Sequence, residues 1–570
     1  MQILRVNMDQ RSTSREDLDD HYRDWAGRGL IARVLLREVE PTCAALGPRN
    51  KLIIANGFLA GTRVSSSGRI SVGAKSPLTG GIKEANAGGV AGDALARLGL
   101  RSIVVEGSPK EDALYLLKIG KDSAEFLSAE EFRGLGTYAL CDKLYERYGK
   151  KIAVICIGPA GEHRMAAAGV AVNDADGYPS RYAGRGGLGA VMGAKGLKAI
   201  VLEDVRAEVP IANKEAFREA QKRLNAALLE NPSTGKEFPE YGTISMLNKI
   251  HKLGGIPTKN FSQGTFDEHY PKLSAEGVRQ TIVERGGEGT PTHGCMQGCV
   301  IRCSNVFPDA RGKAIVSPLE YENLVMLGPN LGIFSLDQIA KLNYMCNDFG
   351  TDTIETGVSI GVAMEAGIIP FGDFEGAAKL MNEIAEGTVL GRVIGQGAAT
   401  AGRVLGVKRV PVMKGQGVAA YDPRAVKGIG VSYVTSPMGA DHTAGHTVYA
   451  KIDHHLPEGQ IQTSLASQIL RAAYDTVCIC GFAIAAIGGN PTLITDLMNA
   501  THGTKLEPTS IQEMGKQVLR MERTFNKSAG FTKAHDTCPE FFRTEKLPPY
   551  DLTFDVPQED IDHFFDPIEN

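Results

Sequence analysis

The chain has 570 residues, 22% of them charged, and a formal net charge of −4 at pH 7. This length exceeds what one core of ~100–200 residues accommodates, so we expect two to four domains. The balanced charge excludes the basic character with which proteins neutralise nucleic-acid phosphates, so nucleic acid is not expected as a partner.

The first 205 residues alternate short β-type runs with glycine-rich turns. Residues 1–17 contain no apolar stretch of signal-peptide length, which predicts a cytoplasmic protein. Helical spacing of apolar residues predicts two helices, over 20–39 and 138–148. Runs of β-branched and apolar residues predict strands at 51–55, 69–72, 102–106, 115–119 and 151–157.

Two glycine-rich segments in this half, 62–89 and 181–195, suit an anionic cofactor. Backbone N–H groups exposed by glycine, together with Arg or Lys, bind phosphates, and amide oxygens suit Mg²⁺. Tight turns explain glycine-rich loops equally well, and neither segment matches a dinucleotide fingerprint or a Walker A motif. A nucleotide enzyme is therefore disfavoured. The polar side chains offered by the two segments include Arg69, Lys75, Asn86 and Arg185.

Beyond residue 205 the sequence favours helices, as in 213–230, 335–349 and 374–386. A second boundary is expected near the Pro- and Gly-containing stretch 410–417. The longest apolar run, 477–489, is shorter than the ~18–20 residues that cross a bilayer, so no membrane association is expected. We predict an α+β fold with a β-rich N-terminal domain and two mainly helical domains, over 1–205, 206–410 and 411–570.

Three cysteines, Cys295, Cys299 and Cys303, stand four residues apart. Thiolates bind soft metals and iron–sulfur clusters, and three at this spacing can hold three corners of one cluster. The same spacing would also place them along one face of a helix as small apolar residues. Zinc is the less favoured metal, because no second Cys or His pair lies close downstream. A fourth ligand must come from elsewhere, and Cys478 or Cys480 is the best candidate.

Nine segments of distinctive sequence follow one another along residues 1–545. They are SGRISVGAKSPLTG (67–80), EANAGG (84–89), IGPAGE (157–162), AGRGGLGAVMGAKGLKAI (183–200), the cysteine loop, EYENLVMLGPNLGI (320–333), NDFGTDTIETG (347–357), YDPRAVKGIGVSYVTSPMGADHT (421–443) and DTVCIC (475–480). In this order they resemble the aldehyde:ferredoxin oxidoreductase family. The resemblance implies a β-rich domain that forms the base for a tungsten or molybdenum bis-pterin, followed by two helical domains.

The resemblance also implies the cofactor ligands. Two six-residue motifs, 347–352 and 475–480, would contribute acids that hydrogen-bond pterin nitrogens, and Mg²⁺ would bridge the pterin phosphates. A [4Fe–4S] cluster would be held by Cys295, Cys299, Cys303 and Cys480. The implied pterin-binding residues are Arg69, Lys75, Asn86, Gly88, Tyr182, Ala183, Gly184, Arg185, Asn347, Thr351, Asp352, Asp475 and Ile479.

The chain departs from the family pattern in three places. Asn347 stands where the first motif begins with Asp, which leaves its pterin contact open. Cys478 stands where the second motif usually has Gly, so a second thiol lies beside the expected ligand Cys480. The first two cysteines of the loop are separated by three residues rather than by the two of the best-known members. These departures bear on the substrate subgroup.

The implied reaction is the oxidation of a small aldehyde to a carboxylic acid with water as the oxygen source. Electrons would pass through the pterin-bound metal and the cluster to ferredoxin or a ferredoxin-like subunit. Glu322 would take a proton from water, with Tyr321 beside it and Glu320 as the less favoured carboxylate. His442 would hydrogen-bond the carbonyl oxygen. The resemblance further implies a homo-oligomer.

Alternatives stay open at this point. Some family members reduce an aromatic acyl thioester within a larger complex, and the same residue types would serve that reaction. A structural cysteine–metal protein on a glycine-rich scaffold is the alternative from a different class. Glu320 and Glu322 could simply be the solvated first turn of a helix, and His442 with His446 an ordinary histidine pair.

Overall fold

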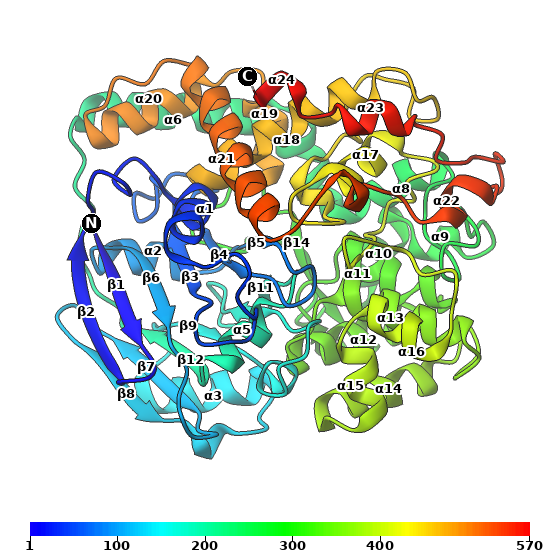
Figure 1. The fold of residues 1–570 in the computed structure, drawn as a ribbon, viewed down its shortest axis with the longest axis horizontal. Helices are drawn as coiled ribbons and strands as arrows, with labels where there is room; N and C mark the ends of the chain where they lie inside the picture. The colour runs from blue at the N-terminus through cyan, green and yellow to red at the C-terminus, as the bar shows by residue number, and fades with distance from the viewer. Residues whose placement is uncertain (570) are drawn as a thin grey trace.

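The computed structural model describes residues 1–569, and its β-rich part is N-terminal (Figure 1). Two six-stranded mixed sheets have the orders β2–β1–β6–β3–β4–β5 and β11–β10–β9–β12–β7–β8. The pairs β1–β6 and β12–β7 are parallel. The strands are β1 (Gln2–Asn7), β2 (Ser12–Asp17), β3 (Leu52–Asn56), β4 (Ile70–Lys75), β5 (Ile82–Ala87), β6 (Leu100–Glu106), β7 (Tyr115–Ile119), β8 (Ala124–Ser128), β9 (Ala153–Cys156), β10 (Val170–Val172), β11 (Arg181–Ala183) and β12 (Leu197–Leu202); the helices among them are α1 (Gly27–Glu38), α2 (Ala91–Arg97), α3 (Thr137–Tyr148), α4 (Pro159–Glu162) and α5 (Leu188–Ala194).

Five layers follow from the alternation of side chains along these strands and from the helices packed against them. In β6, Val104 packs in the core that contains α1, whereas Val105 belongs to a core shared by the two sheets. In β9, Ile155 belongs to that shared core, and Val154 packs with α3. Helices α2 and α5 contact strands of both sheets and so fill this shared core, which gives the order α1, first sheet, α2 with α5, second sheet and α3. Because both faces of each sheet are covered, the central strands are continuous apolar runs rather than alternating ones.

After β12 the chain is mainly helical. A three-stranded sheet, β13–β14–β15, and a two-stranded ribbon, β16–β17, interrupt the helices. The main elements are α6 (Lys214–Glu230), α7 (Phe238–Tyr241), α8 (Ser245–Lys252), α9 (Tyr270–Leu273), α10 (Ala275–Arg285), β13 (Thr290–His293), β14 (Ser304–Pro308), β15 (Ala314–Val316), α11 (Tyr321–Leu327), α12 (Leu336–Phe349), α13 (Thr353–Glu365), α14 (Phe374–Glu386), α15 (Val389–Gly395), α16 (Ala398–Leu405), β16 (Val412–Met413), β17 (Gln416–Gly417), α17 (Lys427–Thr435), η5 (His442–Ala444), α18 (Gln460–Val477), α19 (Ile484–Ile487), α20 (Thr492–His502), α21 (Thr509–Ser528), α22 (Glu540–Thr544), α23 (Gln558–Asp562) and α24 (Asp566–Glu569).

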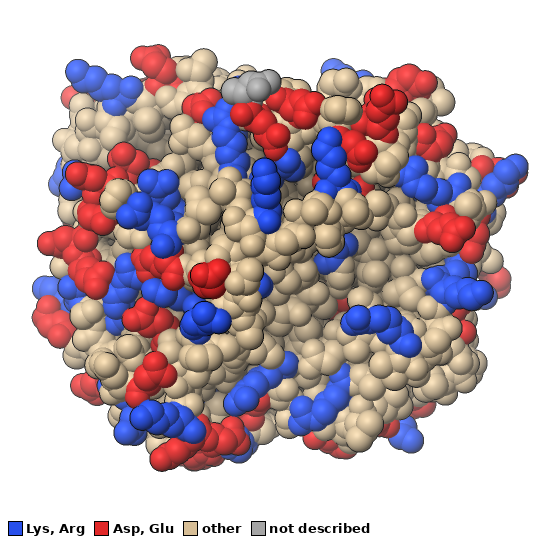
Figure 2. Space-filling view, in the orientation of Figure 1, with Lys and Arg blue, Asp and Glu red and all other residues tan. Residues whose placement is uncertain are grey.

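The C-terminal helices return to the N-terminal part of the chain. Helices α18 and α21 pack against each other and against α1 (Figure 1). The fully buried Arg28 of α1 joins all three helices, with Nε 2.7 Å from Glu522 of α21 and Nη1 3.4 Å from Asp475 of α18. A buried cation needs such partners, because removing it from water costs several kcal/mol. On the face seen in Figure 2, charges of both signs surround a central hollow with few charges.

The predicted α+β class, with a β-rich N-terminal region followed by helical domains, is confirmed. Each predicted strand and helix corresponds to an observed element, but the first helix begins later than expected, at Gly27. The Asp19 carboxylate accepts the N–H groups of His21 and Tyr22, and this turn occupies the start of the predicted helix. The domain boundaries near 205 and 410 stay predictions. Within the described residues, no helix combines the length and apolarity required to cross a membrane.

Candidate active site

A polar cavity lies where the edge strands of the two sheets meet the helical part of the chain. Strands β5 and β11, each at the edge of its sheet, contact one another and contribute one wall. The first turns of α11 and α13, the η5 segment and the cysteine loop contribute the others. The predicted site residues that line it are Arg69, Asn86, Gly88, Tyr182, Gly184, Arg185, Cys295, Cys303, Glu322, Asn347, Thr351, Asp352, His442 and Cys480.

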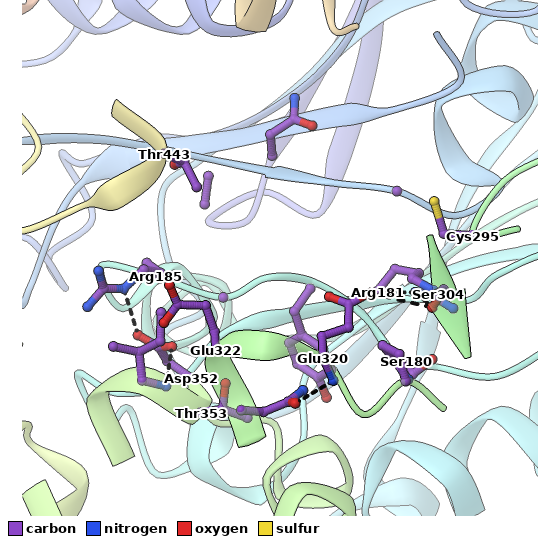
Figure 3. A pocket seen from close by; sticks show the side chains of 18 of the residues that line it. Ser180, Arg181, Arg185, Cys295, Ser304, Glu320, Glu322, Asp352, Thr353 and Thr443 are labelled. Atoms are coloured by element: carbon purple, nitrogen blue, oxygen red, sulfur yellow. Dashed lines mark hydrogen bonds and ion pairs between the residues drawn. The ribbon is translucent and has the colours of Figure 1, made fainter. Parts of the chain in front are cut away.

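Thiols gather at one end of the cavity, where Figure 3 shows Cys295. The loop between β13 and β14 carries Cys295, Cys299 and Cys303, so the alternative of three cysteines along one helix is wrong. Cys480 enters from the end of α18, held by its N–H on the Ser66 carbonyl at 2.8 Å. Hydrogen bonding to Cys295 lowers the pKa of Cys299, whereas its burial and the charges of Cys303 and Cys480 oppose this. The four thiols therefore lie close enough together for three of them to influence the ionisation of Cys299.

Cys478 lies outside this group. It ends α18 in the left-handed conformation, with φ of 56°. Its Sγ lies 3.4 Å from Ser71 Oγ and 3.8 Å from Asn86 Nδ2, on the side of the first sheet. Of the two thiols in the second motif, Cys480 lines the cavity and Cys478 does not.

The cavity wall beside the thiols suits an anionic group. Arg69 bonds to the side chain of Asn86, and among the described residues no carboxylate forms an ion pair with its guanidinium. A Cβ added to Gly88 would lie 3.1 Å from Cys295 Sγ and 3.5 Å from Arg69 Nη1, so this corner has no room for a side chain. Ser180 Oγ and Thr351 Oγ1 are buried, and no residue from 1 to 569 provides a hydrogen-bond partner for them. A cofactor rich in phosphate and amide groups could satisfy them.

A carboxylate and an imidazole meet at the other end of the cavity. Glu322 Oε2 accepts the N–H of Ala420 at 3.0 Å, and its Oε1 lies 3.4 Å from His442 Nε2. Burial raises the pKa of Glu322 to about 8 and lowers the pKa of His442 to about 3. Near neutral pH the pair therefore holds one exchangeable proton on Glu322 beside a neutral imidazole. Such a pair can accept and return a proton.

The two glutamates that flank Tyr321 have different roles. Glu320 is the N-cap of α11, and its N–H donates to Asn323 Oδ1 at 2.6 Å in a reciprocal capping box. Glu320 is thus the cap of this first turn, but it also lines the cavity, with Oε1 3.8 Å from Arg181 Nη1. Glu322 faces the same cavity beside His442 (Figure 3). Tyr321 donates its hydroxyl to the Ala420 carbonyl and does not line the cavity.

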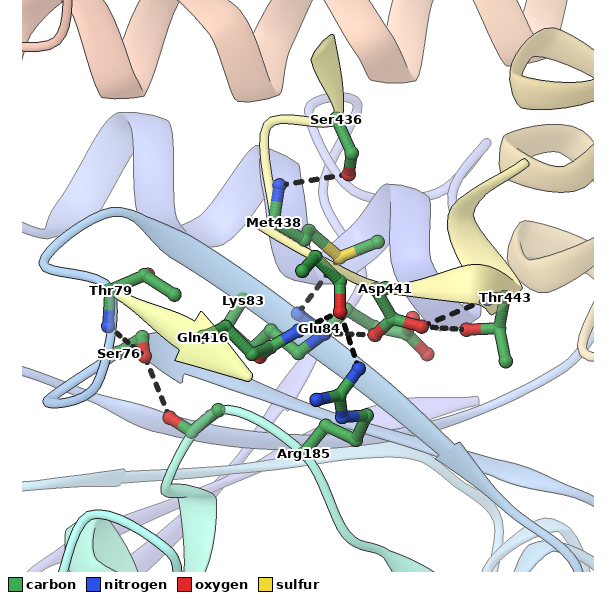
Figure 4. A network of polar contacts seen from close by, with 12 residues as sticks. Ser76, Thr79, Lys83, Glu84, Arg185, Gln416, Ser436, Met438, Asp441 and Thr443 are labelled. Carbon is green, nitrogen blue, oxygen red and sulfur yellow. Dashed lines mark hydrogen bonds and ion pairs between the residues drawn. The ribbon is translucent and has the colours of Figure 1, made fainter. Parts of the chain in front are cut away.

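Asp441 is a site residue that the sequence reasoning missed. It forms a buried ion pair with Lys83 of β5 and accepts the N–H and Oγ1–H of Thr443 at 2.9 and 2.7 Å (Figure 4). Although burial opposes ionisation, Lys83 and Arg185 hold the pKa of Asp441 well below its usual range. Arg185 also donates to the Ala440 carbonyl, so two cations fix the segment that carries His442.

The remaining predicted residues lie behind the cavity wall. The ammonium of Lys75 donates to the Pro41 carbonyl, and Asp475 belongs to the buried network of Arg28 and Arg471. Ala183, Ile479 and the thiol of Cys299 are not part of the lining. Further lining residues that were not predicted include Ser180, Arg181, Ser304, Thr353, Thr443 and Phe482. Position 181 begins a predicted glycine-rich segment, which is the one signal that pointed to Arg181.

Thiols and an acid–base pair face one cavity, beside Arg69, for which the described residues provide no ion pair. This combination of fold and site is typical of a cofactor-dependent oxidoreductase. Residues 3–204 match the model of the aldehyde ferredoxin oxidoreductase N-terminal domain, and residues 219–565 match that of domains 2 and 3. The chain belongs to the aldehyde ferredoxin oxidoreductase family. The resemblance seen in the sequence is thereby confirmed, and an enzyme is favoured over a structural protein.

Individual relatives agree with this assignment. The tungsten-containing aldehyde ferredoxin oxidoreductases of Pyrococcus furiosus and Thermococcus kodakarensis are each 32% identical to the chain, over 96% of it and 92% of their own length. The WOR-like subunit of an aliphatic sulfonate oxidoreductase of Pyrococcus furiosus is 25% identical, over 91% and 85%. The fold is shared with the active-site complex BamBC of benzoyl coenzyme A reductase, at a TM-score of 0.83, 17% identity, and coverage of 100% and 94%.

Proposed function

We propose that this protein oxidises an aldehyde to a carboxylic acid and passes the electrons to ferredoxin. The balanced reaction is RCHO + H₂O → RCOOH + 2 e⁻ + 2 H⁺. The observation that carries the proposal is the Glu322–His442 pair, whose Oε1 and Nε2 atoms are 3.4 Å apart at the opposite end of the thiol-bearing cavity. One cavity thus offers a proton acceptor and a set of soft-metal ligands.

The residues present fit a tungsten bis-pterin and a [4Fe–4S] cluster. Arg69, Arg181 and Arg185 would neutralise the pterin phosphates, and Asn86 would offer an amide oxygen to an accompanying Mg²⁺. The cluster would be held by Cys295, Cys299, Cys303 and Cys480. A site for a single metal ion is a different arrangement, and among the described residues no three His, Cys, Asp or Glu side chains form one. When bound, the metal supplies Lewis-acid polarisation and two-electron redox chemistry.

The chain's own residues then orient the substrate and move its protons. Glu322, in its ionised form, takes a proton from the water that becomes the second acid oxygen. Its buried position makes it a strong enough base for this step, since burial raises the pKa of its carboxyl to about 8. His442 stays neutral and holds the carbonyl oxygen by a ring N–H. Asp441, with Lys83 and Arg185, keeps the His442 segment in place.

The test is metal analysis of anaerobically purified protein, followed by assays with a panel of aldehydes and a viologen acceptor. We expect about four irons per chain, tungsten or molybdenum, a visible spectrum bleached by dithionite, and aldehyde oxidation. Zinc alone in a colourless protein, with no pterin released on oxidation, would contradict the proposal. Reduction of benzoyl coenzyme A without aldehyde oxidation would instead support the aromatic thioester alternative.

A further inference from the structure

The proposed reaction releases two protons for every two electrons, and both protons must leave a buried site. This inference therefore rests on the proposed function. The side chains of Glu322 and His442 are only 19% and 16% exposed. His442 Nε2 faces Glu322, and its Nδ1 is buried without a hydrogen-bond partner among the described residues. Because the two nitrogens point nearly opposite ways across an imidazole ring, Nδ1 is directed away from Glu322.

A row of hydrogen-bonding rings continues from His442 toward the surface. The ring centroids of His442 and His446 are 6.3 Å apart, and that of Tyr421 is 5.6 Å from His442. His446 Nε2 lies 3.2 Å from the Tyr421 hydroxyl. Tyr449 follows, with its centroid 5.8 Å from that of His446, and it is 42% exposed. These rings connect the catalytic pair with solvent, and a bridging water can fill the space between the two imidazoles.

The surroundings of His446 suit a neutral relay. Burial and neighbouring positive charge lower the pKa of His446 well below its usual range, so the ring is uncharged at neutral pH. A neutral imidazole accepts a proton at one nitrogen while it releases another from the second. Burial also raises the pKa of Tyr421, whose hydroxyl therefore stays protonated. The titratable and charged groups that face His446 are His442, Tyr421, Tyr449, Lys249, Arg471 and His454.

We propose that His446, oriented by the Tyr421 hydroxyl, relays protons from the Glu322–His442 pair to solvent beside Tyr449. After the acid has left, His442 in its Nδ1–H form takes the proton of Glu322 at Nε2. It releases the proton on Nδ1 through a water to His446, and this leaves Nε2–H for the next carbonyl oxygen. His446 then releases a proton to solvent, so both rings stay neutral, and each returns to its starting tautomer before the next transfer. No bond to carbon changes in this path. The two electrons leave at the thiol end of the cavity, so charge balances for each turnover.

Two substitutions at one position test the relay kinetically. His446→Phe keeps a ring but no nitrogen, and His446→Gln keeps polarity without two interchangeable nitrogens. We expect kcat to fall roughly 10–100-fold, with KM unchanged, a larger solvent isotope effect and partial rescue by added imidazole. The matched control is His455→Gln on the same segment, because His455 bonds the Leu253 carbonyl at 2.9 Å. Its kcat and isotope effect should stay at wild-type values.

Two other kinetic results would each overturn the relay. Wild-type kcat and isotope effect in His446→Phe would show that protons leave elsewhere. A raised KM with unchanged kcat would show that the ring binds substrate instead. Tyr421→Phe removes only the hydroxyl on His446 Nε2 and should give a smaller change in the same direction; an isotope effect equal to wild type would contradict its orienting role.

A second measurement does not depend on turnover. The Glu322 carboxyl is protonated at neutral pH, so its C=O stretch can be followed by infrared spectroscopy after transfer to D₂O, with Glu322→Gln as the reference for assignment. We expect deuterium exchange at least tenfold slower in His446→Phe than in His455→Gln. Equal exchange rates would overturn the relay. If the wild-type protein oxidises no aldehyde, the proposed function is wrong, and this exchange experiment still decides whether the relay exists.

Discussion

The two ends of the cavity are built in different ways. The thiol end consists of loop residues: three cysteines between β13 and β14, and a fourth that follows α18. The acid–base end consists of residues at the starts of helical segments, Glu322 in α11 and His442 in η5. Loops let several thiols converge on one centre, whereas a helix start fixes one side chain in a dry, defined position. In the proposed reaction, electrons would leave from the thiol end and protons from the acid–base end.

The largest effect is expected from removing a ligand at the thiol end. Cys480→Ser should lose most of its iron, its visible absorption and all measurable turnover, because three protein thiolates hold a cubane cluster poorly. Iron analysis and the spectrum check this. Cys478→Ser is the matched control two residues away, because Cys478 contacts Ser71 and Asn86 rather than the cluster thiols. Iron loss in the control alone would reverse the assignment of the fourth ligand.

The next effect concerns the acid–base end and should leave the thiol end unchanged. Glu322→Gln is expected to lower kcat by about 10²–10⁴-fold, the range for loss of a general base, with iron and pterin contents at wild-type levels. Glu320→Gln serves as the comparison, since Glu320 caps α11 and lines the same cavity beside Arg181 rather than His442; we expect a smaller loss of kcat and a cost in unfolding free energy of ~1 kcal/mol. Full activity in Glu322→Gln would remove this residue from the mechanism.

The pH dependence offers a finer distinction between the two ends. Glu322 acts as a base only when ionised, so kcat/KM should rise with pH through a limb near its pKa of about 8. Stability should change in the opposite direction. The folded-state pKa of Glu322 is raised above its ordinary 4.5, so stability is full below that value and is lost as pH rises toward 8. Glu322→Gln should unfold with a weaker pH dependence, measured by denaturant titration at several pH values.

Asp441→Asn should shift the activity limb without abolishing turnover. Burial is the main cause of the raised Glu322 pKa, and the charge of Asp441 adds to it, so its removal moves the limb to lower pH. The pair variant Lys83→Met/Asp441→Asn controls for the buried ammonium that the single change leaves unpaired. A limb that stays at wild-type pH in both variants would assign it to another group.

The smallest effect is expected from filling the corner between the cavity wall and the thiols. Gly88→Ala would place a methyl 3.1 Å from Cys295 Sγ, so iron content and kcat should each fall a few-fold, in keeping with about 1–3 kcal/mol of overpacking. Gly489→Ala, whose added Cβ would meet nothing within 4 Å, is the control. Wild-type iron content in Gly88→Ala would show that the neighbouring side chains move enough to accept the methyl group.

Much of the fold and part of the site could be predicted from local patterns. Apolar runs predicted β3, β6 and β7, and the spacing of four drew attention to the cysteine loop. The start of α1 was misjudged, because the Asp19 side chain competes locally for backbone N–H groups. The choice between Cys478 and Cys480 was open in the sequence, since both thiols lie in one short motif and only their directions differ.

The sequence by itself determined the family, the α+β class and the chemical types of the ligands, because these depend on residue identity and short-range spacing. Tertiary structure alone decided which groups share a cavity and which protonation states they hold. Lys83 and Asp441 are 358 positions apart, yet their buried ion pair supports the His442 segment. Burial sets the pKa values of Glu322 and His442, and burial is a property of the packed chain rather than of any motif.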